Sequence, residues 1–301
     1  MHPWGGAVID RSPPLGRETW FWSARVGSPL VEGWGNLVQG FRFDPSTWDV
    51  RGIWASSGQF NANNSGKCAY HEMRAFVTHT AVLSQQAIRA VELQSGDLAL
   101  VLGCPGGRIR VIQPGGMRID NNAYHDIGTL DSTSYDLGLG CSALAVRAEA
   151  NGWLTIWCGT TYGPCVQPFE YTNPQGLLHD DEVATGAVHR LTWIPGSGFS
   201  NVPVTKQLYK STALPRGGYG VVGLTVADLL PAPGDEVIVG TLAGDIIVLN
   251  EGLTTVLWRG HVPGAAGFYN SIHVENLDGD PFPELYVSGS FGIWRFTLPG
   301  E

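Results

Sequence analysis

The chain has 301 residues, of which 43% are hydrophobic, 15% are charged, 41 are glycine and 19 are proline. This hydrophobic content excludes an intrinsically disordered chain, and a net charge of −9 with only three lysines excludes the basic surface that binds nucleic acid. No apolar run approaches the roughly 18 residues that cross a bilayer, so we expect no membrane span.

The first six residues, Met-His-Pro-Trp-Gly-Gly, lack the positive charge and the apolar stretch of a signal peptide. We therefore expect a cytoplasmic protein if Met1 is the native start, and an extracytoplasmic protein if the chain is processed. The five cysteines include no Cys-x-x-Cys pair, which argues against a zinc knuckle. Cys158 and Cys165 flank a glycine-containing turn, and they either form a disulfide or are small buried residues.

A short unit recurs along the chain: an apolar strand, a small residue, a glycine-centred turn and a second apolar strand. The intervals between the small residues are 47, 56, 81 and 49 residues, and the longest contains a polar insertion at 162–187. Without this insertion the period is roughly 50 to 55 residues, which is typical of a four-stranded propeller blade with its loops. The small residues are Ser56, Gly103, Gly159, Gly240 and Gly289.

The last two units show how each unit divides into strands. Alternating and apolar segments predict four strands in the fourth unit, at 223–228, 236–241, 245–250 and 254–259. The final unit has only three, at 271–276, 284–288 and 292–298. We predict that its missing outer strand is the tryptophan-rich segment 18–25, which would pair with the last strand and close the ring.

The sequence therefore predicts an all-β fold: a single five-bladed β-propeller of four-stranded antiparallel blades, with strands named a to d from the centre outward. In a propeller, the d–a loops and the b–c loops leave on the same face. Both large insertions, 59–68 and 162–187, are interpreted as b–c loops, so this face is the expected binding face. The predicted blades are 34–84, 85–125, 138–212, 219–260, and 268–298 together with 18–25.

Most d–a connections carry an aromatic residue just before strand a. Aromatic rings stack on the apolar face of a sugar, and the same side chains can anchor a protein partner. We therefore expect a lectin-like or protein-interaction module; the alternative is that these aromatics wedge between adjacent blades. The expected ligand residues on this face are Trp34, Tyr135, Tyr162, Tyr219, Tyr269 and Asn270.

Strand a of each blade is expected to line the central channel. Alternation places a mixed, partly polar set of residues toward the channel and an apolar set between the blades. We assign Gln39, Arg89 and His273 as ligand-binding residues there, and Arg89 and His273 could hold an anionic group. The alternative is a water-filled channel lined by polar residues. The mixed set is Gln39, Arg89, Leu144, Thr225 and His273; the apolar set is Val38, Ile88, Ala143, Leu224 and Ile272.

The a–b loop of the last blade reads Asn-Leu-Asp-Gly-Asp-Pro-Phe-Pro-Glu, and oxygen ligands at this spacing suit Ca²⁺. With this loop the chain resembles the FG-GAP (VCBS-like) propeller repeat, best over 87–115 and 222–298. The resemblance implies a propeller fold and Ca²⁺ bound by loop carboxylates. The alternative is a tight turn with Asx-type backbone bonds. The ligands would be Asn276, Asp278, Asp280 and Glu284.

An enzyme is the second hypothesis: a carbohydrate lyase or hydrolase at the channel mouth. It would use Arg89 and His273 together with acidic residues of the insertion, Asp180, Asp181 and Glu182. The sequence has no Gly-x-Ser-x-Gly elbow and no phosphate-binding loop, and the starts of the a strands lack the carboxylate pair of a glycosidase. We therefore expect a binding protein rather than an enzyme, with a saccharide or protein partner; assembly into an oligomer stays open.

Overall fold

The structure is a computed structural model. The structure describes residues 3–11, 18–25, 37–44, 49–55, 88–95, 98–103, 108–114, 119–120, 123–124, 129–136, 139–164, 186–200, 203–208, 221–231, 233–241, 244–262, 271–277, 279, 283–289, 292–296 and 298. The regular elements in these ranges are β-strands, and their pairings are antiparallel, which confirms the predicted all-β class. No helix long and apolar enough to cross a membrane occurs in this part of the chain.

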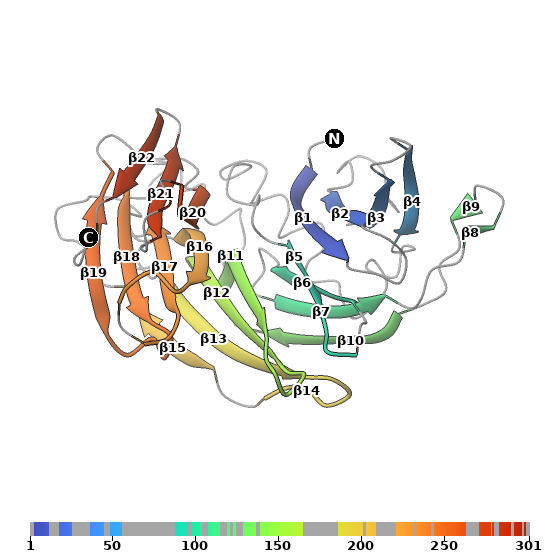
Figure 1. Ribbon diagram of the computed structural model, residues 1–301. Helices are drawn as coiled ribbons and strands as arrows, with labels where there is room; N and C mark the ends of the chain where they lie inside the picture. The colour runs from blue at the N-terminus through green and yellow to red at the C-terminus, as the bar shows by residue number, and fades with distance from the viewer. Residues whose placement is uncertain are drawn as a thin grey trace, which may run out of the picture.

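The strands form five sheets of three or more strands and one small ribbon (Figure 1). Sheet 1 contains, in spatial order, β1 (Pro3–Arg11), β2 (Glu18–Arg25), β3 (Leu37–Asp44) and β4 (Asp49–Ala55). Sheet 2 contains β5 (Ile88–Glu92), β6 (Leu98–Gly103), β7 (Arg108–Pro114) and β10 (Thr129–Asp136). The ribbon is β8 (Ile119–Asp120) with β9 (Ala123–Tyr124).

Sheets 3 to 5 follow along the chain. Sheet 3 contains β11 (Leu139–Ala148), β12 (Leu154–Pro164), β13 (Ala187–Ile194), β14 (Gly198–Phe199) and β15 (Val204–Gln207); β14 and β15 both pair with β13. Sheet 4 contains β16 (Val221–Ala227), β17 (Glu236–Thr241), β18 (Asp245–Asn250) and β19 (Val256–His261). Sheet 5 contains β20 (Ser271–Glu275), β21 (Glu284–Gly289) and β22 (Gly292–Phe296).

Consecutive sheets touch through their first strands. β1 contacts β5, β5 contacts β11, β11 contacts β16, and β16 contacts β20. Figure 1 shows this succession as an arc that runs from the blue strands of sheet 1 to the red strands of sheet 5. The first strand of each sheet therefore lies on the inner side of the arc, and the later strands lie farther out.

Three hydrophobic interiors separate sheets 2 to 5. Leu144 and Trp193 of sheet 3 face Val101 of sheet 2, while the opposite face of sheet 3 packs on sheet 4. Sheet 4 also packs on sheet 5, where the Trp258 and Phe296 rings meet edge to face with centroids 5.5 Å apart. Burial of each large aliphatic side chain contributes about 1.5–3 kcal/mol, so these interiors hold the sheets together.

The recurring small residue permits close contact between neighbouring sheets. A Cβ atom at Gly103 on β6 would lie 2.6 Å from Sγ of Cys141 on β11, and a Cβ at Gly159 on β12 would overlap Cγ1 of Val221 on β16. In both cases the second strand of one sheet abuts the first strand of the next. The internal repeat therefore marks the positions at which the backbone of one sheet meets a side chain of its neighbour.

The predicted pairing of segment 18–25 with the last strand is wrong. Residues 18–25 form β2, which pairs on one side with β1 and on the other with β3, so both of its edges are occupied within sheet 1. No sequence pattern predicted β1, which is joined to β2 by only six residues. Pairing of such near neighbours costs far less chain entropy than pairing across the whole chain.

The predictions for sheets 4 and 5 were closer. The strands at 236–241 and 245–250 are confirmed to the residue, and the other predicted strands of these sheets differ by at most two residues at either end. Sheet 1 instead spans residues 3–55, where the sequence analysis had placed the first unit at 34–84. Sheet 2 extends to residue 136, beyond the predicted boundary at 125.

Candidate functional site

The two ends of the sheets differ in the length of their connections. We call the end that carries 93–97, 149–153, 228–235, 251–255 and 276–283 the turn end. It also carries 12–17, 45–48, 195–203 and the longer connection 115–128, which contains the ribbon of β8 and β9. The opposite end, the loop end, carries 26–36, 56–87, 165–186, 209–220 and 263–270 together with the short connections 104–107, 242–244 and 290–291. The insertion 59–68 therefore joins sheet 1 to sheet 2, and is not the b–c loop that was predicted, but it still belongs to the loop end.

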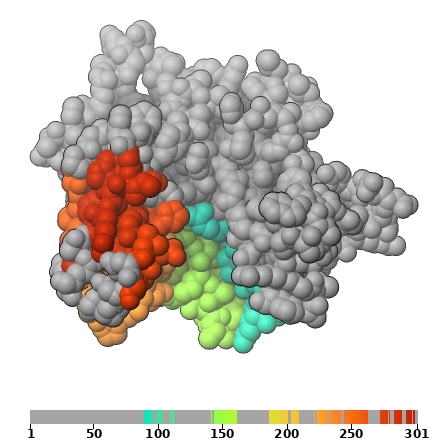
Figure 2. All heavy atoms as spheres, turned by 45° about the horizontal axis from the view of Figure 1, so that its top comes forward, coloured from blue at the N-terminus to red at the C-terminus, as the bar shows by residue number. Residues whose placement is uncertain are grey.

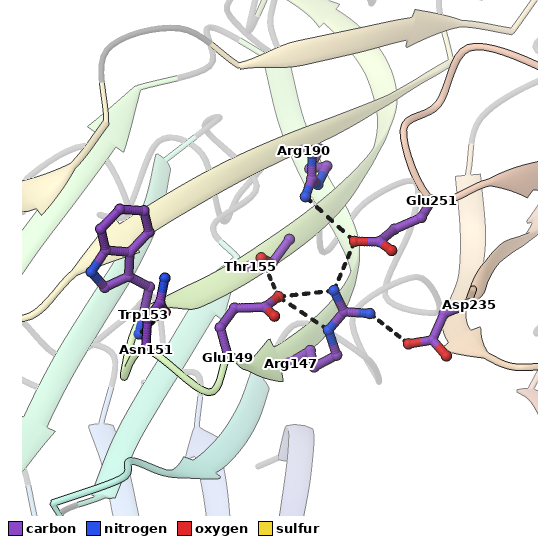
Figure 3. A network of polar contacts seen from close by, with 8 residues as sticks. All are labelled: Arg147, Glu149, Asn151, Trp153, Thr155, Arg190, Asp235 and Glu251. Atoms are coloured by element: carbon purple, nitrogen blue, oxygen red, sulfur yellow. Dashed lines mark hydrogen bonds and ion pairs between the residues drawn. The ribbon is translucent and has the colours of Figure 1, made fainter. Parts of the chain in front are cut away.

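A network of ion pairs joins sheets 3 and 4 at the turn end (Figure 3). Arg147, near the end of β11, contacts Glu149 at 2.9 Å, and it reaches Asp235 at 2.5 Å and Glu251 at 2.7 Å on sheet 4. Arg190 on β13 also contacts Glu251, at 3.4 Å. The guanidinium of Arg147 therefore links three segments that lie far apart in the sequence.

The network determines the charge state of its members. Burial acts to lower the pKa of Arg147, but hydrogen bonds to Glu251, Glu149 and Asp235 outweigh it and raise that pKa. Burial acts to raise the pKa of Glu149, but hydrogen bonds from Thr155 and Arg147 lower it below its ordinary value. Both side chains are therefore charged at neutral pH and are engaged in holding the two sheets together.

Two buried glutamates stabilise the turns of sheets 4 and 5. Glu236, at the start of β17, is 2% exposed and accepts hydrogen bonds from the backbone N–H groups of Leu229 at 2.8 Å and Leu230 at 3.1 Å. Glu284, at the start of β21, is fully buried and accepts one from the Leu277 N–H at 3.0 Å. The same position of the repeat therefore holds the preceding turn in both sheets.

The predicted Ca²⁺ loop is described only in part. Asn276 accepts a hydrogen bond from the Gly279 N–H at 2.7 Å, as in an Asx-type turn, and Gly279 has a φ of 80°. Glu284 contacts Arg295 at 3.0 Å in addition to Leu277. Asp278 and Asp280 lie outside the described residues. No group of three or more metal-ligating side chains occurs in the described part of the chain, and the Ca²⁺ site stays a prediction.

The predicted channel residues do not share one level of the sheets. Gln39 lies on β3, the third strand of sheet 1, and not on the inner strand β1. Arg89 pairs with Val101, two residues before Gly103, whereas His273 pairs with Tyr286, three residues before Gly289. Arg89 is partly buried, and this burial lowers its pKa, while His273 is exposed.

The expectation that alternate side chains of the inner strand face the channel and the interior in turn was also wrong. Ala143 and Leu144 are both fully buried, the first between sheets 3 and 4 and the second between sheets 2 and 3. Both faces of sheet 3 therefore pack on neighbouring sheets, so alternation along β11 does not separate channel positions from interior positions. Leu224 and Ile272, two other members of the predicted apolar set, are buried as expected.

The predicted aromatic residues are only partly described. Tyr135 lies within β10, paired with Ile109, and Tyr162 lies within β12, so neither belongs to a loop as predicted. The remaining predicted residues of the loop end fall outside the described ranges. They are Trp34, Tyr219, Tyr269, Asn270, Asp180, Asp181 and Glu182.

Sequence reasoning missed the ion-pair network of the turn end. Arg147 is separated from Asp235 by 88 residues and from Glu251 by 104, so no local sequence pattern predicts these contacts. The only usable signal was the repeat itself, because it places the first turns of sheets 3 and 4 at the same end.

No family model and no curated protein matches this chain. Among solved structures, the α-L-arabinanase of Penicillium chrysogenum complexed with arabinobiose is 8% identical, with a TM-score of 0.50 over 99% of this chain and 79% of that one. The Chaetomium thermophilum Raptor structure is 14% identical, with a TM-score of 0.46 over 94% of this chain. A mutant of AofleA from Arthrobotrys oligospora is 13% identical, with a TM-score of 0.44 over 95% of this chain. The chain spans only 19% and 64% of the last two proteins.

Proposed function

We propose that this chain is a five-bladed β-propeller that binds a saccharide at its loop end. The observation that carries the proposal is the contrast between the two ends of the sheets. At the turn end, Arg147, Glu236 and Glu284 are all engaged in holding turns and sheets together. The two longest connections, 56–87 and 165–186, both leave from the loop end, and binding residues usually lie on such loops above a rigid scaffold.

The propeller interpretation is supported by the succession of sheets. Five antiparallel sheets follow one another, and each first strand contacts the next from β1 to β20. The similarity to the arabinanase structure, at a TM-score of 0.50, concerns the fold and supports the same arrangement. A propeller of this kind holds its loops rigidly around one central opening.

A saccharide is the proposed ligand because of the aromatic residues near the loop end. Tyr162 lies close to the loop-end terminus of β12, and the sequence adds Trp34, Tyr219 and Tyr269 in loop-end connections. Flat aromatic rings stack on the C–H faces of sugars, and amide side chains such as Asn270 bind their hydroxyl groups. A protein partner would use the same aromatic side chains as anchors.

A carbohydrate-active enzyme is the second candidate, and the fold similarity to an arabinanase favours it. Such an enzyme would need two carboxylates placed about 5–10 Å apart on either side of the scissile bond. Asp180, Asp181 and Glu182 would supply these carboxylates from the connection between β12 and β13, with Arg89 and His273 nearby. The enzyme would use the same end of the molecule as the binding protein.

One experiment distinguishes these functions. The purified chain is titrated calorimetrically with a panel of oligosaccharides that includes arabinobiose, and each mixture is then analysed for hydrolysed or eliminated products. We expect heat of binding without product, and a loss of roughly tenfold or more in affinity for Tyr162→Ala. Trp153→Ala is the matched control, because Trp153 is 42% exposed at the turn end. Product formation would establish the enzyme, and an equal loss for Trp153→Ala would contradict the choice of end.

We also propose that the loop 276–284 binds Ca²⁺ through the side chains of Asn276, Asp278, Asp280 and Glu284. The ordered turn at Asn276 and Gly279 supports this, because it bends the chain as a Ca²⁺ loop requires. Calorimetric titration with CaCl₂ should give a saturable heat in the wild type and none in Asp278→Ala. An identical heat in both proteins, or none in the wild type, would contradict the site.

A further inference from the structure

Two cysteines lie together in the interior between sheets 2 and 3. Cys141 on β11 and Cys158 on β12 are 1% and 0% exposed, and they form a disulfide between adjacent strands with Cα atoms 6.0 Å apart. The sequence analysis had considered Cys165 as the partner of Cys158. The structure instead joins Cys158 to a residue that lies 17 positions before it, within the same sheet.

Neighbouring residues shield this disulfide from solvent, and both of its cysteines are almost fully buried. The backbone of Gly103 abuts Cys141, so closely that an added Cβ would lie 2.6 Å from Sγ. His189 stands opposite Cys158 in the strand register, is 5% exposed, and shares a 2.9 Å hydrogen bond through Nδ1 with the Thr205 hydroxyl. Burial lowers the pKa of His189 to about 4, as expected for an imidazole kept away from water.

We propose that the Cys141–Cys158 bond is installed in an oxidising compartment before sheets 2 and 3 pack together, and that their packing then seals it. One cysteine thiolate attacks a small-molecule or protein disulfide, which releases one thiolate and leaves a mixed disulfide. The second cysteine thiolate then attacks the protein sulfur of that mixed disulfide and releases the other thiolate. The two cysteines thus lose two electrons and two protons, and the oxidant is reduced to two thiols.

The burial of both sulfurs implies that the bond forms before the sheets pack. Thiol–disulfide exchange needs the attacking sulfur to reach the attacked one directly, and no reagent can do so at sulfurs buried beside Gly103 and His189. Bond formation therefore belongs to a state in which sheet 2 has not yet covered β11 and β12. Disulfides form and persist outside the reducing cytosol, so the bond favours the extracytoplasmic alternative for this chain.

The first test locates the bond and its compartment. The full chain is produced both in the bacterial cytosol and by export to the periplasm, alkylated with iodoacetamide in guanidinium chloride at lysis so that buried thiols also react, and digested without reductant. Cleavage after Arg147 separates the two cysteines, and cleavage after Tyr162 separates Cys158 from Cys165. We expect a linked Cys141–Cys158 peptide in the exported protein and alkylated cysteines in the cytosolic one. Alkylation of both cysteines in the exported protein, or full linkage in the cytosol, would overturn the proposal.

The second test measures how strongly the packing of the sheets protects the disulfide from reduction. The linked protein is treated with a phosphine reductant, folded or in guanidinium chloride, and reduction of the linked peptide is followed by mass spectrometry. We expect reduction to be roughly tenfold slower or more in the folded protein, because it requires the sheets to separate. Gly103→Ala should accelerate reduction of the folded protein. Gly252→Ala should not, because no atom lies closer than 3.6 Å to its added Cβ. Equal rates in folded and unfolded wild type would overturn the seal, whether or not Gly103→Ala folds.

Discussion

Sheets 4 and 5 share a repeat but differ in how they are buried. In sheet 4 every residue of β17 is buried, and the four central residues of β18 are buried as well, because sheets 3 and 5 cover its two faces. In sheet 5, Leu285 and Val287 are buried toward sheet 4, while on the opposite face, here called the open face, Ile293 of β22 is 75% exposed. Figure 2 shows the red atoms of sheet 5 on the visible surface. The repeat therefore determines the strands, while the number of neighbouring sheets determines the burial.

The turn glutamates of the two sheets differ in the same way. Glu236 in sheet 4 accepts hydrogen bonds from two backbone N–H groups, those of Leu229 and Leu230. Glu284 in sheet 5 accepts a hydrogen bond from the Leu277 N–H and also contacts Arg295, whose side chain is 46% exposed on the open face. A buried carboxylate in the enclosed sheet is thus stabilised by peptide groups, and one beside the open face also by a cation.

Truncation of matched isoleucines should show the largest difference between the two sheets. Ile247→Ala in sheet 4 removes a fully buried side chain and should lower the free energy of unfolding by about 2–5 kcal/mol. Ile293→Ala in sheet 5 should change it by about 0.5 kcal/mol or less, because the side chain is mostly exposed. Denaturant unfolding of both variants measures this. Equal losses would mean that another part of the chain or a partner covers Ile293 in solution.

A glycine substitution tests the contact that covers sheet 4 from the other side. Gly159→Ala would place a methyl group against Val221 at the start of β16, and should destabilise the protein by about 1–3 kcal/mol. Gly252→Ala is the matched control in a turn with free space, and should change the stability by about 0.5 kcal/mol or less. If Gly159→Ala were as stable as the control, sheets 3 and 4 would not approach as closely as described.

The sequence was sufficient for the strands of sheets 4 and 5 but not for β1 or for the contacts between sheets. The segments 236–241 and 245–250 were predictable because continuous apolar runs bounded by turn residues indicate buried strands. The pairing of β2 was not, because the weakly patterned β1 gave no signal of a nearer partner. Arg147 was equally inaccessible, since its partners lie in another sheet and are specified by packing rather than by spacing.

The ion-pair network between sheets 3 and 4 should contribute less than the interior beneath it. Arg147→Lys keeps the positive charge but loses the planar group that contacts Glu149, Asp235 and Glu251 together, and should cost about 1 kcal/mol at low salt. High salt should reduce the difference, because the side chains are about one-third exposed. The free energy of unfolding at two ionic strengths measures this, with Arg259→Lys, at an exposed position of β19, as the control. A loss that does not depend on salt would indicate that packing of Arg147 over Trp157, at 5.4 Å, is the main contribution.

The smallest effect is expected in the pH dependence that Glu236 contributes. Burial raises the pKa of this carboxyl above its ordinary value of 4.5, although the Leu229 and Leu230 N–H groups lower it in part. The folded state therefore holds the proton more tightly than the unfolded state. Between the ordinary and the raised pKa, the folded state binds more protons, so stability decreases as the pH rises through this window and is greatest below it.

Glu236→Gln keeps an oxygen that can accept from the same backbone groups and removes the ionisation. We expect the variant to lose this decrease, so that its stability relative to the wild type improves as the pH rises from about 4 toward neutrality. Unfolding measured at several pH values tests this, with Glu284→Gln as the comparison in the open sheet. An unchanged pH profile for Glu236→Gln would show that water reaches this carboxylate. The neighbouring sheets would then bury the strands of sheet 4 but not its first turn.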